Sequence, residues 1–312
     1  MSTVSSPIQA EAETPTGATG GSVLGLLFAN GGVRFGGIVL VILFVIALAA
    51  PLLGTIDPAF LDPTYRNKLP LETHPILKDD GEEVIVTHWM GTDTLGRDLY
   101  SRVIYGTRVS LIVGFSVALL AIGVGLFVGL VSGYIRWLDT VIMRVMDGLM
   151  AIPAILLALS LVALWGAGLV TVILAIAVPE IPRVVRLVRA VVLSVREEPY
   201  VEAAIAVGTP TPKILYRHIL PNTIAPLIVQ ATYTCGFAIL VEAILSFLGV
   251  GIPTDIPTWG NIMAEGRLLF RVFPHAILFP GIFLAFAVLA INVLGDGLRD
   301  TLDPRFAKRT AG

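Results

Sequence analysis

The sequence has few charged residues and an excess of apolar ones. Of its 312 residues, 14% are charged and 55% are hydrophobic, and the mean hydropathy is +0.86. Soluble domains carry roughly 25% charged residues, so a water-soluble core does not explain this composition. We expect an integral membrane protein. The formal net charge is −2, and no basic patch or nucleic-acid motif is present, so we expect no nucleic-acid partner.

Residues that hold metals or nucleotides are equally scarce. Cys235 is the single cysteine, which excludes a disulfide or a thiolate metal cluster within the chain. The four histidines (His74, His88, His218 and His275) are too far apart to place two ligands on one helix face. None of the four lysines follows a glycine, so the chain has no phosphate-binding loop. We therefore expect no cofactor on this chain, no metal site and no enzymatic activity.

What the sequence does contain is a series of long apolar runs. Each is close to the roughly 20 residues that a helix needs to cross a bilayer. Together they predict an all-α membrane protein with about six transmembrane helices, at about 36–53, 109–134, 138–165, 169–188, 222–250 and 273–295.

The remaining segments suggest a domain plan and an orientation. Residues 1–25 read as a disordered tail, 26–54 as an anchor helix, 55–106 as an acidic outer loop, 107–300 as a five-helix core and 301–312 as a second tail. Lys and Arg are most frequent between the fourth and fifth runs and in the final tail. Because cytoplasmic loops carry this excess, we predict that both termini and the 197–221 segment are cytoplasmic.

The 197–221 segment is a polar interruption between two apolar runs. Tyr200, Ala203, Ala204 and Val207 fall at positions i, i+3, i+4 and i+7, which form one face of a helix. Gly208 is placed to end that helix in the left-handed conformation. Glu202 lies beside the face, either as a solvated carboxylate or as the partner of a base on another protein.

A second short helix is expected to follow. Thr209-Pro210 and Thr211-Pro212 each offer an N-cap with proline at the first helical position. The helix would extend over 213–220 and stop at Pro221. The sequence thus predicts a helix–turn–helix that projects from the membrane.

Several charged residues lie within the apolar runs, where an uncompensated charge costs a few kcal/mol. Arg144 and Asp147 are three residues apart and can pair with each other. Asp147, Glu180 and Glu242 are candidates for the wall of a translocation path. The same three acids could alternatively form the proton or ion relay of a secondary transporter or channel. No Ser/His/Asp or paired-His arrangement indicates an intramembrane enzyme.

The order of residues in the 197–221 segment resembles the EAA motif of ABC-importer permeases. Glu202, Ala203, Ala204, Gly208, Leu220 and Pro221 match that motif, and Arg217-His218-Ile219-Leu220-Pro221 fits its peptide-type branch. His218 stands where many families have an aliphatic residue.

Three further stretches are similar to the C-type permease subunit of dipeptide and oligopeptide importers. One is the outer-loop signature with Gly91, Asp93, Gly96, Arg97 and Asp98. The others are 245–251 with 259–261, and 294–300 with 303–305. For the 91–98 segment the residues themselves favour a local structural role, with Asp93 turning the chain and Arg97 pairing with Asp93 or Asp98.

The resemblance implies an ABC type I importer permease fold in a bacterial or archaeal cytoplasmic membrane. It implies a second homologous permease, two ATP-binding subunits that carry ATP and Mg, and an extracytoplasmic solute-binding protein as partners. It also implies that Tyr200 to Pro221 form the coupling helix that contacts an ATP-binding subunit. The substrate would be a peptide or a related small solute.

Overall fold

A computed structural model describes residues 23–77 and 83–302, and most of this part is helical. Two antiparallel strands interrupt the helices near the N-terminal third, with Glu72 opposite His88. The elements are α1 (Val23–Ala29), α2 (Gly31–Ala49), β1 (Glu72–Leu77), β2 (Glu83–His88), α3 (Leu99–Tyr134), α4 (Arg136–Met150), α5 (Ala154–Trp165), α6 (Leu169–Arg196), α7 (Pro199–Ala206), α8 (Thr211–Ile214), a π-helical turn (Leu215–Ile219), α9 (Leu220–Phe247), α10 (Trp259–Gly266) and α11 (His275–Leu302). Short 3₁₀ turns lie at Ala50–Leu52 and Arg267–Leu269.

All six predicted apolar runs are helical. By length and composition, four helical stretches of the described residues can cross a membrane: Gly31–Leu52, Leu99–Tyr134, Thr211–Phe247 and His275–Leu302. The number rises to five if α4 and α5 form one broken span. The remaining run corresponds to α6, which is 28 residues long but carries Glu180, Arg183 and Arg186 among its apolar side chains.

The third run is not the straight span that the sequence suggested. α4 and α5 meet at an angle of 88°, and the bend lies just before Pro153, the N-cap of α5. Proline has no amide proton and disfavours the helical conformation at the residue before it. The helix therefore stops before Ile152, and a new one begins in another direction.

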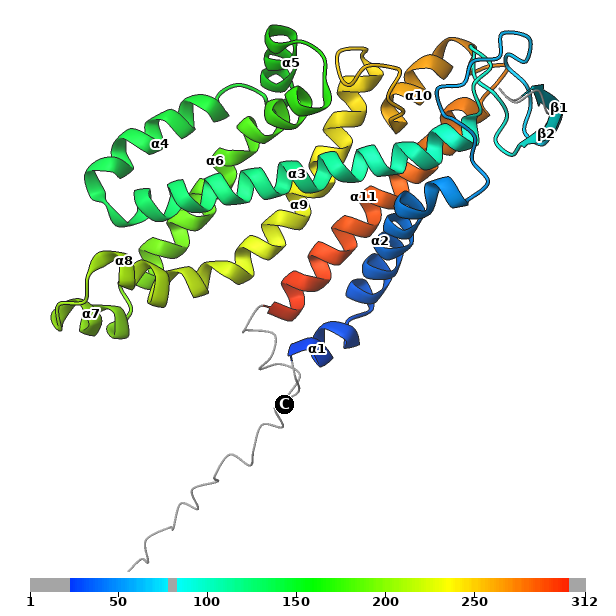
Figure 1. Ribbon diagram of the computed structural model, residues 1–312. Helices are drawn as coiled ribbons and strands as arrows, with labels where there is room; N and C mark the ends of the chain where they lie inside the picture. Colours follow the sequence, from blue (N-terminus) through cyan, green and yellow to red (C-terminus); the bar gives the residue numbers. More distant parts are fainter. Residues whose placement is uncertain (1–22, 78–82, 303–312) are drawn as a thin grey trace, which may run out of the picture.

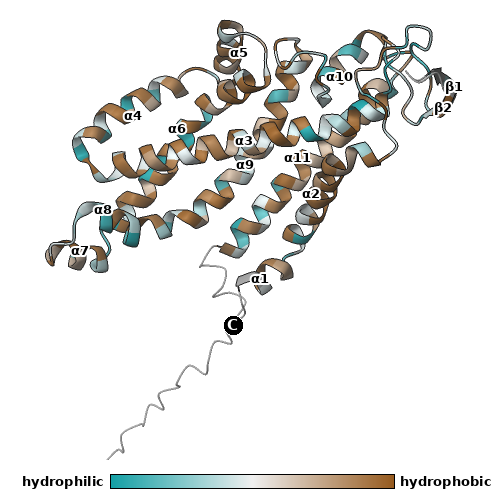
Figure 2. Ribbon diagram, viewed as in Figure 1, coloured by the Kyte–Doolittle hydropathy of each residue, from teal (hydrophilic) through white to brown (hydrophobic). Residues whose placement is uncertain are grey.

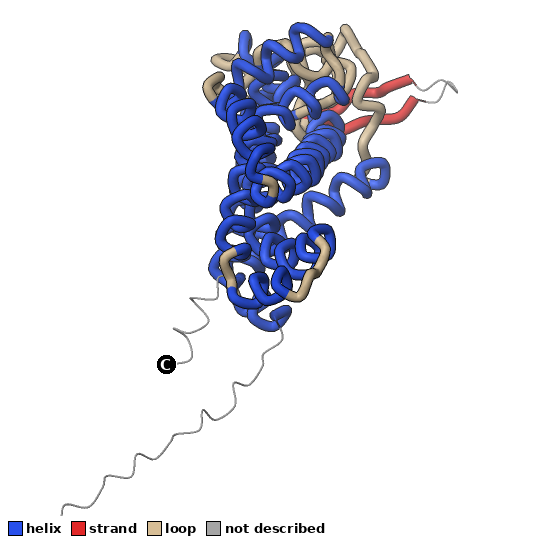
Figure 3. The backbone as a smooth tube through the Cα atoms, turned by 90° about the vertical axis from the view of Figure 1, so that its left-hand side faces the viewer, coloured by secondary structure: helices blue, strands red, loops and turns tan. Residues whose placement is uncertain are grey.

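The helices arrange the molecule with two distinct ends (Figure 1). α7 and α8, the start of α1 and the end of α11 lie at one end, which we call the α7 end. The strands β1 and β2, α5 and α10 lie at the other, which we call the hairpin end. A view turned by 90° shows the same separation, with the two strands projecting beside the helices (Figure 3).

Glycines allow a close and extensive contact between α3 and α6. Gly125, Gly129 and Gly133 occur every fourth residue along α3 and face Val184, Val188 and Val192 of α6. A Cβ added at these glycines would lie only 2.5, 2.6 and 2.7 Å from the respective valine side chains. Small residues at this spacing let membrane helices approach closely. The four-residue spacing of these glycines is visible in the sequence, but their valine partners on α6 are not.

Hydrophobic residues predominate along the helices (Figure 2), and many large apolar side chains are exposed on the outside of the bundle. On α2 they include Phe35, Val41 and Leu48, and on α3 they include Leu119 and Phe127, which are 77% and 70% exposed. Such surfaces match the hydrocarbon of a bilayer, in which apolar side chains have no reason to be buried.

Some predicted boundaries are wrong. α1 begins at Val23, before the predicted end of the tail, and α3 begins at Leu99, well before residue 107. The segment predicted as a plain outer loop contains the β1–β2 hairpin. α11 extends to Leu302, beyond the predicted core. The remaining parts of the predicted tails, 1–22 and 303–312, lie outside the described residues.

Candidate functional site

At the α7 end, a short helix and a tight turn protrude from the bundle. α7 begins with Pro199 at its N-terminus and ends at Ala206. Gly208 follows with φ of +79°, the left-handed conformation that the sequence predicted. Its amide donates to the Ile205 carbonyl at 2.9 Å, and the Thr209 amide donates to the Ala204 carbonyl at 3.0 Å. These two bonds form a Schellman motif, which satisfies the carbonyls at the end of the helix.

The side chains of this protrusion are largely exposed and apolar. Val207 is 81% exposed, Tyr200 and Ile205 are each 46% exposed, and Ala203 is exposed while Ala204 is half-buried. We call these five residues the α7 knuckle. Glu202 is also exposed and has no ion-pair partner within residues 23–77 and 83–302.

Beneath the knuckle, the same segment is firmly attached to the bundle. Val201, Ile214 and Ile219 are fully buried, and they pack in one apolar cluster with valines of α6, among them Val188 and Val192. The α7 region therefore has an apolar outer surface that is not covered and an apolar inner surface that is. Movement of the knuckle must displace α6 or break this cluster.

The predicted second helix does not stop at Pro221. The chain is helical from Thr211 to Phe247, with a π-helical turn at Leu215–Ile219 immediately before the proline. Proline is tolerated in the first turn of a helix, where its missing amide is not needed, and the π-turn re-sets the hydrogen bonding just there. The predicted threonine caps are also absent, because Pro210 is the N-cap of α8 and no side chain bonds to its amides.

His218 and Asn222 lie close to Tyr200 of the knuckle. The rings of His218 and Tyr200 are 6.1 Å apart, and the Asn222 side chain donates to the His218 carbonyl at 2.7 Å. Leu220 is half-buried and Pro221 is exposed. The structure thus brings the two halves of the EAA-like motif together.

The signature at 91–98 lies at the hairpin end and is mostly buried. Gly91 and Gly96 both have φ of +83°. A Cβ at Gly96 would overlap the carbonyl of Asp62, and a Cβ at Gly91 would overlap the carbonyl of Lys68. Both positions therefore require glycine for conformation and for space.

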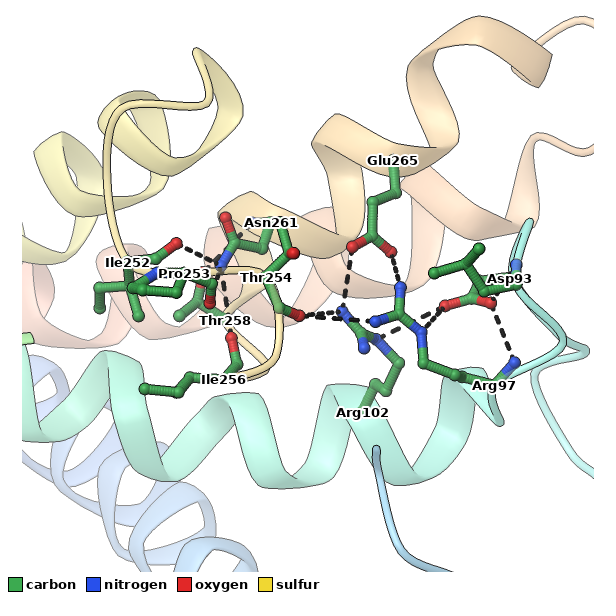
Figure 4. Close-up of polar contacts among 11 residues, drawn as sticks. Asp93, Arg97, Arg102, Ile252, Pro253, Thr254, Ile256, Thr258, Asn261 and Glu265 are labelled. Atoms are coloured by element: carbon green, nitrogen blue, oxygen red, sulfur yellow. Dashed lines mark hydrogen bonds and ion pairs between the residues drawn. The ribbon is translucent and has the colours of Figure 1, made fainter. Parts of the chain in front are cut away.

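Asp93 and Arg97 form the centre of an ion-pair cluster (Figure 4). The Asp93 carboxylate accepts from the Arg97 backbone amide at 2.9 Å and from Arg97 Nε at 2.7 Å. Arg97 also pairs with Glu265 of α10, and Arg102 Nη2 lies 3.4 Å from Glu265 Oε1. Burial raises the pKa of Glu265, and the nearby Arg102 and Arg97 oppose that shift.

This cluster holds the start of α3 against α10. Arg102 is completely buried, and both Arg97 and Arg102 also donate to the Thr254 carbonyl, at 3.5 and 3.4 Å. In the adjoining loop, the Asn261 side chain donates to three carbonyls, those of Ile252, Pro253 and Ile256 (Figure 4). The sequence left Asp93 and Asp98 as alternative partners of Arg97, and the structure selects Asp93. The sequence contained no signal for Glu265, which lies far along the chain.

Asp98 joins α3 to the hairpin. Its carboxylate accepts from the Ser101 amide at 2.8 Å, which caps α3, and lies 2.8 Å from His88 Nδ1. His88 Nε2 lies 3.0 Å from His74 Nδ1, and His74 Nε2 lies 3.0 Å from Asp62. Hydrogen bonds from Thr64 lower the pKa of Asp62, with His74 adding to the shift. Arg97 pairs with Asp93 and Glu265, whereas Asp98 contacts Ser101 and His88. His74 connects to Asp98 only through His88.

The three acids proposed for the path have separate partners. Asp147 is 56% exposed and pairs with Arg186 of α6 at 2.5 Å, so the predicted pairing with Arg144 is wrong. Glu180 is buried and accepts from Arg183 Nη1 at 3.0 and 3.2 Å. Glu242 is completely buried and accepts from Ser246 at 2.8 Å.

Comparison with known proteins gives a consistent family. Residues 102–308 match the family described as the inner membrane component of binding-protein-dependent transport systems. A probable peptide ABC transporter permease protein, y4tQ, from Sinorhizobium fredii is 51% identical over 89% of this chain and 90% of its own length. The dipeptide transport system permease protein DppC from Alkalihalophilus pseudofirmus is 41% identical over 86% and 84%.

Similarity also extends to a permease of a glutathione transport system and to a solved structure. The glutathione transport system permease protein GsiD of Pectobacterium atrosepticum is 42% identical over 70% of this chain and 73% of its own. A chain of the inward-facing MetNI methionine ABC transporter superposes with a TM-score of 0.53, covering 66% of this chain and 98% of that one at 20% identity, which shows a shared fold. This chain belongs to the family of inner-membrane permease components of binding-protein-dependent ABC importers.

Proposed function

We propose that this permease subunit couples ATP hydrolysis in a partner protein to the import of a short peptide through the α7 knuckle. The observation that carries the proposal is the two-sided α7 segment. Its outer residues are bare and apolar, with Val207 81% exposed, while Val201 beneath them is fully buried. An exposed apolar patch of this kind is typical of a contact with another protein, and the resemblance of this segment to the EAA motif supports an ATP-binding subunit as that protein.

The buried side of the segment supplies the mechanical connection. Val201, Ile214 and Ile219 pack against α6, and the helix that starts at Thr211 continues without interruption to Phe247. A push on the knuckle is therefore transmitted to α6 and α9 together. Because packed interfaces have discrete arrangements rather than a continuum, such a push favours a switch between two states of the bundle.

We infer that the α7 end faces the cytoplasm. The basic residues Arg189, Arg196, Lys213, Arg217 and Arg299 belong to α6–α9 and to the end of α11, near this end. Cytoplasmic segments of membrane proteins carry such an excess of Lys and Arg. Both termini are then cytoplasmic, and the hairpin end faces outward, toward an extracytoplasmic solute-binding protein.

The complete importer would contain a second homologous permease, two ATP-binding subunits and the solute-binding protein. ATP and Mg would be bound by the ATP-binding subunits. The peptide substrate is proposed because the relatives named above are peptide, dipeptide and glutathione permeases.

A secondary transporter that uses Asp147, Glu180 and Glu242 is the alternative. A proton relay needs groups that can pass a proton from one to the next. Here each acid has a different partner. Asp147 pairs with Arg186, Glu180 pairs with Arg183, and Glu242 accepts from Ser246. The alternative also leaves the exposed knuckle without a role.

Gly208→Val tests the coupling role in the reconstituted importer with its ATP-binding subunits and solute-binding protein. The substitution strains the turn at φ of +79° but meets no neighbouring atom, so we expect a folded complex that hydrolyses ATP with little uptake. Gly54→Val is the matched control, because Gly54 has φ of +69° and is equally open, but belongs to the opposite end. Normal ATP-driven uptake by Gly208→Val would contradict the role, and uptake by the unmodified complex without ATP would refute the importer.

A further inference from the structure

A groove lined by both apolar and polar side chains extends along α9, between α6 and α11, in a part of the molecule that includes candidate membrane spans. Its larger part has a volume of about 660 Å³ and is lined by Pro221, Gln230, Tyr233 and Arg299, among others. A smaller cavity of about 270 Å³ shares Gln230 and Tyr233 with it and adds Glu180, Arg183 and Asn292. The two are therefore neighbours along α9, and together they extend from Pro221 in the coupling segment to Glu180 and Arg183 of α6.

The depth of the charged residues excludes hydrocarbon as the neighbour of this groove. Glu180 lies about 17 Å along the axis of α6 from its first residue, at 1.5 Å per residue, and Arg183 lies one turn further. An ion pair with amides and a phenol beside it is costly against lipid, and intramembrane charges usually face water or protein. The lipid-facing surface of α3, with Leu119 and Phe127, has an entirely different character.

Arg183 is arranged to bind an additional anionic group. Only Nη1 bonds to Glu180, and Nε and Nη2 have no hydrogen-bond partner in the described part of the chain. The guanidinium lies over the ring of Phe237, with 5.3 Å between Cζ and the ring centroid. Its side chain is 46% exposed and lines the cavity. A guanidinium presents two donors along its Nε–Nη2 edge with the spacing of a carboxylate.

We propose that this groove is the wall of the solute path and that the Nε–Nη2 edge of Arg183 binds a carboxylate of the solute. The inference rests on the proposed function and names a specificity-determining residue within it. Glu180 acts as a positioning residue, because its fully buried carboxylate holds Nη1 and leaves Nε and Nη2 without a hydrogen bond among the described residues. Gln230 and Asn292 supply amides for the remainder of a peptide.

Thiol labelling of the full importer in inside-out vesicles tests the position of the path. Cys235 is buried and is replaced by alanine, and Gln230→Cys, Asn292→Cys and the control Leu119→Cys are made in that background. A membrane-impermeant thiol reagent is expected to modify the two groove cysteines and not Leu119→Cys, and transported dipeptide should slow the groove reactions. Unreactive groove cysteines, with ATP-driven uptake intact, would overturn the inference and leave the proposed function standing.

Substitution of Arg183 tests the carboxylate. Arg183→Gln should reduce the preference for a dipeptide over its C-terminal amide by about 10- to 100-fold, the equivalent of one charged hydrogen-bonded contact. Because Arg183→Gln leaves Glu180 unpaired, Arg183→Lys is made as well. Lysine keeps the ion pair with Glu180 but lacks the two parallel donors of the guanidinium. Arg183→Lys should therefore lower the preference for the dipeptide over its amide while the protein still folds. Each variant is compared with the unmodified complex and the same binding protein, so selection by that protein cancels. An unchanged preference in a folded variant would refute the carboxylate contact.

Discussion

The two ends of the molecule use similar residues for opposite purposes. At the hairpin end, Gly91 and Gly96 are closed in by the carbonyls of Lys68 and Asp62, and the charges pair within the chain. At the α7 end, Gly208 has the same type of backbone conformation with nothing near it, and Glu202 has no partner among the described residues. The first signature stabilises the subunit, and the second presents a surface to another protein. The residue types alone do not distinguish these roles, but burial does.

The largest effect is expected for glycine substitution at the two ends. Gly96→Ala should lower the free energy of unfolding by about 3 kcal/mol or more, because strain at positive φ is added to a direct overlap with Asp62. Gly208→Ala should cost only about 1 kcal/mol from the strain alone. Thermal unfolding of the two purified variants in detergent measures the difference, and equal losses would mean that the two turns are equally constrained.

Loss of an ion pair should also lower the free energy of unfolding more within the buried cluster at the hairpin end than at the exposed Arg186–Asp147 pair. Arg97→Ala removes a cationic partner from the carboxylates of Asp93 and Glu265, which are largely shielded from water. It should destabilise the subunit by about 3 kcal/mol. Arg186→Ala removes a pair in which both side chains are about half exposed, and should cost less than about 1 kcal/mol. Unfolding by denaturant compares the two variants directly. If Arg97→Ala were as stable as Arg186→Ala, the cluster would not stabilise the contact between α3 and α10.

Within the α7 segment, we expect Val201 to contribute to stability and Val207 to contribute to the contact with the ATP-binding subunit. Val201→Ala removes buried methyl groups and should cost about 2 kcal/mol. Val207→Ala, at an exposed site, should change stability by less than about 0.5 kcal/mol and yet reduce the binding of the ATP-binding subunit. Co-purification of that subunit and unfolding are measured on the same preparations. If Val207→Ala retained normal association, the apolar knuckle would not be the contact.

The smallest effect is expected at Glu202. Exposed ion pairs contribute about 0–1 kcal/mol, so Glu202→Gln should change the affinity for the ATP-binding subunit by no more than about fivefold. Titration of the two subunits in detergent gives the value. A much larger loss would assign a desolvated pair to Glu202 and would make it a main element of the contact.

Local features of the fold were predictable from the sequence. Apolar runs located the helices, and Gly208 marked the end of α7, because both signals depend on neighbouring residues only. The bend at Pro153 was readable but was missed inside a long apolar run. Pro221 was misread as a stop, since a helix that reorganises into a π-turn has no simple local signature.

Features that depend on distant parts of the chain were not predictable. Glu265 reaches Arg97 only after α10 folds back onto the start of α3, and Asp147 meets Arg186 rather than its near neighbour Arg144. The groove along α9 likewise appears only when α6 and α11 lie on either side of it. The sequence located the intramembrane acids but contained no signal for which of them lines the groove.

Site-specific photo-crosslinking from Val207 tests the coupling claim most directly. A photoreactive residue is placed there and, as a control, at Ile85 on β2, which is 75% exposed at the opposite end. In the assembled importer we predict that position 207 crosslinks to an ATP-binding subunit, with a yield that changes on ATP binding, and that position 85 does not. Crosslinks from position 207 to lipid or to the solute-binding protein alone would contradict the proposed coupling role and orientation.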